Sequence, residues 1–95
     1  MNKIIWLLTA TDTKTFLKKK GILQLFVVWS FATNSANAKS DVDLVYVAKK
    51  SMWRELFDIT HFLEQKLGKK IDIIEKKHLN KKIAKDILAH KIDII

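Results

Sequence analysis

Apolar residues recur in the first part of the chain with the period of a helix and then with that of a strand. Residues 1–20 carry a loose helical stripe of large apolar side chains, which are Ile4, Ile5, Leu8, Phe16 and Leu17. Thr11 and Asp12 interrupt this stripe, so a second helix can begin there. Gly21 follows in the position that favours a left-handed residue after a helix. Residues 22–29 are apolar and rich in β-branched and aromatic side chains, which predicts a buried strand.

The middle of the chain predicts a second strand and the longest helix. Residues 33–40 are mostly small and polar, which indicates a loop, and residues 40–48 read as a strand. Ser51 is expected to cap a helix over residues 52–67. The apolar stripe of this helix is expected to be Trp53, Leu56, Ile59 or Thr60, Leu63 and Leu67. Gly68 is expected to end it.

The last third adds a strand, a helix and an apolar tail. Residues 69–75 predict the strand, and the helix is marked by Leu79, Ile83, Ile87 and Leu88. Residues 92–95 predict an edge strand, or a contact for a partner or a second copy. This alternation of helices and strands predicts an α/β (α+β) fold with helices packed on a small sheet, as a single domain over residues 1–95. The short loop between the first two strands favours antiparallel pairing there, so the sheet should be mixed.

The composition is that of a globular domain with a strong positive charge. The 95 residues carry a formal net charge of +8 and contain no cysteine. The charge favours an anionic partner, such as a nucleotide, a nucleic acid or an acidic protein. A solvated lysine-rich face without a partner is the alternative interpretation, and the sequence leaves both open. The absence of cysteine fits a reducing compartment, and the apolar run at 22–32 is too short to span a membrane. We therefore expect a cytoplasmic protein without a membrane partner. Trp53, Phe57 and Phe62 are expected to pack their helix rather than to stack on bases.

Two aspartates, Asp41 and Asp43, stand at the start of the second strand. Residues two apart in a strand point to the same side, so these carboxylates share one face. Like charges held so close raise each other's pKa, and a cation such as Mg²⁺, which prefers oxygen ligands, relieves that repulsion. Asp72, centred in an isoleucine-rich strand, is the natural third carboxylate. The alternative interpretation is an edge strand whose outer face is wet.

The stretch WSFATNSANAKSDVDL, residues 29–44, resembles the signature of the minimal nucleotidyltransferases, small members of the DNA polymerase β-like superfamily. That signature is Gly-Ser, an aromatic residue or Arg, Ala-Arg-Gly, a short variable run, and then Ser-Asp-x-Asp-Leu. The matching positions are Ser30, Phe31, Ala32, Ala36, Ser40, Asp41, Val42, Asp43 and Leu44. Asp72 takes the place of the family's third carboxylate. The similarity extends over most of the chain.

The resemblance implies a nucleotidyltransferase that binds ATP, or another nucleoside triphosphate, together with Mg²⁺ at up to two sites. The residues it assigns to metal binding and catalysis are Asp41, Asp43 and Asp72. Those it assigns to nucleotide contact are Ser30, Thr33, Asn34 and Ser40. The resemblance also implies an antitoxin that binds a HEPN-type toxin and transfers AMP to a hydroxyl group of it.

Three positions depart from the signature. Trp29 replaces the glycine before Ser30, Thr33 replaces the arginine, and Asn34 replaces the following glycine. Glycine lets the backbone approach a phosphate closely, and arginine binds phosphate through two parallel hydrogen bonds. Two readings therefore stay open: an enzyme with a rearranged phosphate loop, and a degenerate family member that acts as a binding subunit of a HEPN toxin complex. A basic nucleic-acid-binding domain without a metal is the third.

Overall fold

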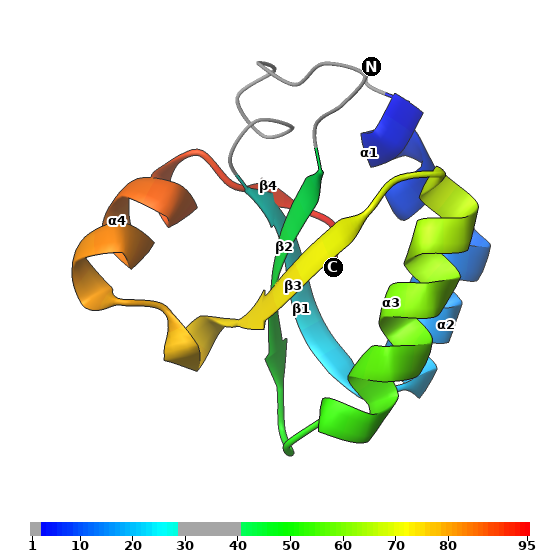
Figure 1. Cartoon of the computed structure of the whole chain (residues 1–95), viewed down its shortest axis with the longest axis horizontal. Coiled ribbons are helices and arrows are strands. Elements are labelled where there is room, and N and C mark those ends of the chain that lie inside the picture. The colour runs from blue at the N-terminus through cyan, green and yellow to red at the C-terminus, as the bar shows by residue number, and fades with distance from the viewer. Residues whose placement is uncertain (1–2, 29–40) are drawn as a thin grey trace.

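The computed structural model describes residues 3–28 and 41–95, which form a four-stranded sheet with helices on both faces (Figure 1). The helices are α1 (Lys3–Leu8), α2 (Thr11–Lys19), α3 (Trp53–Leu67) and α4 (Lys81–Ala89), and a short 3₁₀ helix, η2, spans Lys76–His78. The strands are β1 (Ile22–Val28), β2 (Val42–Ala48), β3 (Ile71–Glu75) and β4 (Ile92–Asp93). The expected α/β class is confirmed.

The sheet is mixed, as the sequence predicts, and its strand order is β3-β2-β1-β4. β1 pairs with β2 in antiparallel fashion, and β2 pairs with β3 in parallel. The apolar tail forms the edge strand β4, which lies antiparallel to β1, and Ile94 just beyond it is buried. The two carboxylate-bearing strands, β2 and β3, are therefore neighbours.

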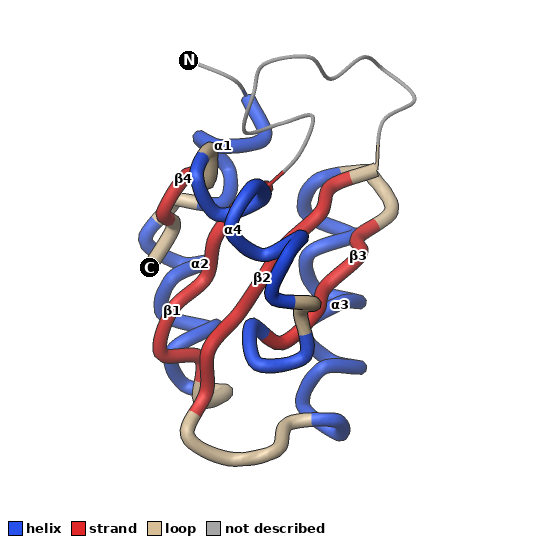
Figure 2. The backbone as a smooth tube through the Cα atoms, turned by 90° about the vertical axis from the view of Figure 1, so that its left-hand side faces the viewer, coloured by secondary structure: helices blue, strands red, loops and turns tan. Residues whose placement is uncertain are grey.

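The sheet separates two hydrophobic clusters. α1, α2 and α3 cover one face, whereas α4 lies on the other (Figures 1 and 2). The larger cluster joins the three helices to inward side chains of the strands, including Leu25, Leu44, Ile71 and Leu63. The smaller cluster, under α4, contains Phe26, Val28, Val45 and Ile87. Since alternate residues of β1 and β2 enter opposite clusters, both central strands are covered on both sides, as their near-continuous apolar sequence requires.

Helix α3 ends where the sequence predicts but faces a different way at its start. Gly68 adopts a left-handed conformation (φ 66°), and its amide donates to the carbonyl of Glu64. The expected cap by Ser51 is wrong: Met52 precedes the helix, without a side-chain cap, and is buried. The expected core position of Trp53 is also wrong, because 72% of this residue is exposed. Phe57 is 79% exposed, whereas Leu63 and Leu67 are buried.

In the last helix, Ile83 does not face the sheet and is half exposed, so its expected core position is wrong as well. Ile87 is buried there instead, and Leu79 and Leu88 pack around it. None of the helices in the described ranges combines the length and apolar character needed to cross a membrane.

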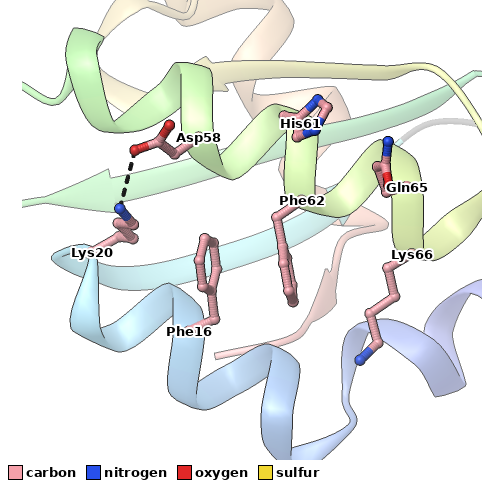
Figure 3. Close-up of a pocket in the computed structure, with 7 residues that line it drawn as sticks. All are labelled: Phe16, Lys20, Asp58, His61, Phe62, Gln65 and Lys66. Atoms are coloured by element: carbon pink, nitrogen blue, oxygen red, sulfur yellow. Dashed lines mark hydrogen bonds and ion pairs between the residues drawn. The ribbon is translucent and has the colours of Figure 1, made fainter.

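Aromatic stacking and two ion pairs join α2 to α3, and Figure 3 shows the stacked rings and one of the pairs, Lys20 with Asp58. The rings of Phe16 and Phe62 are stacked with centroids 4.0 Å apart, so Phe62 does pack its helix. On one side of the stack the Lys20 ammonium lies 3.1 Å from the Asp58 carboxylate. On the other, Lys66 pairs with Asp12. These lysines also lie over the two rings, with Lys20 5.5 Å from the centroid of Phe16 and Lys66 5.7 Å from that of Phe62. An open hollow of about 560 Å³ lies between the helices, and the charged side chains of Lys20, Asp58 and Lys66 are part of its lining.

Thr13 is the buried polar side chain of the described core, and its hydroxyl donates to the carbonyl of Leu7 at 3.0 Å. This bond ties α2 to the end of α1. Thr13→Val keeps the shape but removes the donor, so we expect the free energy of unfolding to fall by about 1 kcal/mol in urea titrations. Thr15→Val, at an exposed position of the same helix, is the matched control. Equal losses in both variants would contradict a role for this bond.

Candidate functional site

Asp43 and Asp72 are direct neighbours across the parallel pair β2 and β3. Val42, Leu44, Ile71 and Ile73, the residues on either side of the two aspartates, all pack in the larger cluster. Because side chains alternate along a strand, both aspartates point to the opposite face, which carries α4. The alternation in the sequence thus places two carboxylates side by side near the N-terminal ends of their strands.

A shallow hollow of about 380 Å³ opens at this pair, and its walls are formed by Asp43, Leu44, Asp72, Ile73 and Ile74. Asp43 is partly buried, whereas Asp72 is exposed. Ile74 is 38% exposed, which places an apolar surface next to the two carboxylates. The sequence reading did not single out Ile74; its position two residues after Asp72, on the same strand face, is the signal that would have identified it.

Asp41 lies just before β2 and is exposed. Its charge nevertheless reaches Asp43: burial, the charge of Asp72 and the charge of Asp41, in that order, raise the pKa of the Asp43 carboxyl above its ordinary value of 3.8. The four ion pairs printed for residues 3–28 and 41–95 join lysines to Asp12, Asp58, Glu75 and Asp93, and none of them involves Asp41, Asp43 or Asp72. The fold therefore holds several carboxylates near one another.

The stability of the metal-free protein is expected to fall as the pH rises through the pKa of Asp43. The folded protein binds this proton more tightly than the unfolded chain does, so ionisation favours unfolding, beginning near pH 3.8 and ending above the raised pKa. Urea unfolding of the wild type and Asp43→Asn in EDTA, from about pH 3 to about pH 7, isolates this contribution. Lys66 lowers the pKa of Asp12, so the ionisation of Asp12 changes the stability in the opposite direction. Both proteins contain Asp12, so this contribution cancels when their free energies of unfolding are subtracted. A pH-independent difference would contradict the assignment.

The expected nucleotide contacts Ser30, Thr33, Asn34 and Ser40, like Trp29, lie outside the described residues. The attachment points of residues 29–40 are nevertheless defined. Val28, the last residue of β1, pairs directly with Asp43, and Asp41 follows the segment at its other end. Residues 29–40, which include Ser30 and Ser40, are therefore joined at both ends to residues that lie beside the carboxylates.

The donor atoms at this site suit a hard cation. Mg²⁺ binds one or two protein carboxylates and completes its shell with water and phosphate oxygens, and the Asp43–Asp72 pair offers such carboxylates. Across the described portion of the chain, however, no group of three or more His, Cys, Asp or Glu side chains is arranged to hold a metal ion. Asp41, Asp43 and Asp72 are thus not gathered into one three-ligand cluster. The three histidines, His61, His78 and His90, are exposed.

Comparison with known proteins identifies the class to which this fold and site belong. The family model described as "Polymerase beta, Nucleotidyltransferase" matches residues 12–95. The chain therefore belongs to the polymerase β nucleotidyltransferase family. No curated protein sequence matches it.

Solved structures with the same fold include nucleotidyltransferases and toxin–antitoxin complexes. A structure described as a minimal nucleotidyltransferase superposes with a TM-score of 0.74 at 22% identity, over 83% of this chain and 82% of that one. A toxin–antitoxin structure with AMP-PNP gives 0.72 at 10% identity, over 86% and 68%. A tri-AMPylated HEPN toxin from Shewanella oneidensis in complex with its MNT antitoxin gives 0.68 at 10% identity, over 96% and 71%. At these identities the likeness establishes the fold.

Proposed function

We propose that this protein transfers a nucleoside monophosphate, AMP from ATP in the first instance, to a hydroxyl group of a partner protein, with Mg²⁺ as cofactor. The observation that carries the proposal is the side-by-side placement of Asp43 and Asp72 on neighbouring strands. Membership of the nucleotidyltransferase family supports it.

Each aspartate has a proposed role in this reaction. Asp43 and Asp41 would hold the metal, with Asp72 as a further ligand, and the metal would neutralise charge on the phosphates. Asp72, which is exposed and on the edge strand β3, accepts the proton of the acceptor hydroxyl. The hydroxyl oxygen then forms a bond to the α-phosphorus, and the bond to the leaving pyrophosphate breaks. Ser30, Thr33, Asn34 and Ser40 are the proposed contacts to the nucleotide.

The proposed acceptor is a HEPN-type toxin, and the proposed setting is a cytoplasmic toxin–antitoxin pair. The toxin–antitoxin structures that share the fold support this choice, one described with AMP-PNP and one with an AMPylated HEPN toxin. A net charge of +8 suits an anionic nucleotide or an acidic partner surface. Self-association through the edge strands is a further proposal, since β3 and β4 end the sheet.

Calorimetric titration of the protein with Mg²⁺-ATP tests the proposal. Heat that appears with Mg²⁺ and disappears with EDTA would support it, and mass spectrometry of the partner after incubation would detect an added AMP. An absence of binding at millimolar nucleotide would reject the enzyme and favour the alternative, a degenerate binding subunit. The specific observation behind that alternative is the replacement of the signature's Gly, Arg and Gly by Trp29, Thr33 and Asn34.

A further inference from the structure

A second hollow opens on the face of the sheet to which Asp43 and Asp72 point, near the opposite end of their strands. Its volume is about 480 Å³, within the range of roughly 300–1,000 Å³ that is usual for small-molecule sites. The end of β2, η2 and α4 all contribute to its lining. Val47, one of the lining residues, follows Asp43 by four positions in β2, so both side chains point to the face that carries α4.

The outer face of the edge strand β3 connects this hollow to the carboxylates. Asp72, Ile74 and Lys76 alternate along the chain on that face, and all three are exposed. Asp72 and Ile74 line the hollow at the carboxylates, whereas Lys76, the first residue of η2, lines the second hollow. Ile74 stands roughly 7 Å along the chain from each of the other two. α4 packs on β1 and β2, and Figure 2 shows β3 beside it, so this path stays open.

The second hollow combines an apolar floor with a cationic rim. Val47, Leu79 and Leu88 pack in the smaller hydrophobic cluster and also line the hollow, and Ala84 adds only a methyl group from α4. The lysines of the rim are Lys76, Lys77 and Lys81, which are all exposed. Glu75, 3.6 Å from the Lys77 ammonium, offsets one of these charges. Such a lining suits a flat, uncharged ring that is attached to an anionic group.

The attachment of residues 29–40 gives a bound nucleotide its direction. That segment joins β1 to β2 through Val28 and Asp41, next to the carboxylates, and it carries the proposed nucleotide contacts. The second hollow lies the other way along β2, beyond Val45. A nucleotide with its α-phosphate at Asp43 would therefore direct its outer phosphates toward residues 29–40 and its nucleoside along β3 toward the second hollow.

We propose that the hollow between η2 and α4 binds the nucleoside part of the substrate nucleotide, an inference that rests on the proposed nucleotidyl transfer. The ribose lies over Ile74, and the base enters the hollow and covers its apolar floor. Gln24 also lines the hollow, and its amide can both donate to and accept from the edge of a base. The lysines of the rim attract the anionic ligand. An acidic peptide would meet the same lysines but would carry no phosphate for a metal at Asp43 and Asp72.

Ala84→Phe tests the proposal, because its ring takes the space of the base. In calorimetric titrations of the full chain it is expected to weaken binding of Mg²⁺-ATP at least about tenfold. Binding of Mg²⁺-tripolyphosphate, which has no nucleoside, should stay unchanged, whereas Asp43→Asn should weaken both ligands. Ala89→Phe, at the exposed last position of α4, is the matched control and should change neither.

Adenosine in EDTA supplies a second measurement that needs neither metal nor phosphate. In ¹H–¹⁵N correlation spectra of the wild type, adenosine is expected to shift the amide signals of Leu79, Ala84 and Leu88, which line the hollow. In Ala84→Phe these shifts should be lost.

An unchanged affinity of Ala84→Phe for Mg²⁺-ATP would overturn the proposal. Equal losses for ATP and tripolyphosphate would also overturn it, because they would show that the substitution acts on the carboxylates. Binding of Mg²⁺-tripolyphosphate without adenosine shifts at the hollow would reject the nucleoside site alone. Adenosine shifts without binding of either phosphate ligand would support the nucleoside site and reject the proposed transfer. Shifts with polyglutamate but not with adenosine would assign the hollow to an acidic protein.

Discussion

Asp43→Asn is expected to stabilise the metal-free protein and, in the same molecule, to weaken Mg²⁺-dependent nucleotide binding at least about 100-fold. Stability should rise because burial and the charges of Asp72 and Asp41 all disfavour the ionised form of this side chain. Asparagine has nearly the same shape and no charge. Substituting a residue that only orients a metal ligand typically costs about 10–100-fold in metal affinity or activity. Asp43 is proposed as a ligand itself, so its substitution should weaken binding at least as much.

Urea unfolding in EDTA and calorimetric titration with Mg²⁺-ATP measure the two effects separately. Substituting a residue that serves only the fold would destabilise the protein. A gain in stability together with a loss of nucleotide affinity therefore identifies a carboxylate that serves binding. Asp93→Asn is the matched control, because Asp93 lies in the second copy of the pentapeptide KIDII and is exposed. It pairs with Lys91 at the surface, and the loss of such a pair costs little. Loss of nucleotide binding in Asp93→Asn but not in Asp43→Asn would show that the site is misplaced.

The features of the fold that the sequence predicted are those determined by local chemistry. Gly21 and Gly68 both adopt positive φ where a helix was expected to end. The alternation around Asp43 and Asp72 was sufficient to place both carboxylates on the same face, once β2 and β3 were taken as neighbours. These inferences need only the period of a strand and the geometry of a helix end, so they survive without knowledge of the tertiary structure.

The inferences that failed depend on which face of a helix is buried. α3 has two apolar stripes near its start, and the sequence does not say which of them meets the sheet. The structure buries Met52 and Ile59 and leaves Trp53 and Phe57 in solvent. The meeting of Lys18 and Lys20 with Lys49 and Lys50 was equally hidden, because it requires the end of α2 to lie beside the turn from β2 into α3. Tertiary packing decides both questions.

Leu63→Ala is expected to lower the free energy of unfolding by about 2–5 kcal/mol, out of a total near 5–15 kcal/mol for a domain of this kind. Leu63 is fully buried in the larger cluster, on the side of α3 that faces the sheet. Its truncation removes apolar contacts and leaves a cavity that α1 and the sheet can fill only in part. Alanine has at least the helix propensity of leucine, so the loss reports packing alone. The shift of the urea midpoint measures this loss, provided that the slope of the free energy of unfolding against urea concentration is unchanged.

Phe57→Ala, compared with Leu63→Ala, separates an exposed position of α3 from a core position. It removes a larger side chain than Leu63→Ala does, yet 79% of Phe57 is exposed, so the change in stability should stay within about 0.5 kcal/mol. A loss comparable to that of Leu63→Ala would mean that Phe57 faces the core and that the orientation of α3 is wrong. The two substitutions together thus test which apolar stripe of α3 packs on the sheet.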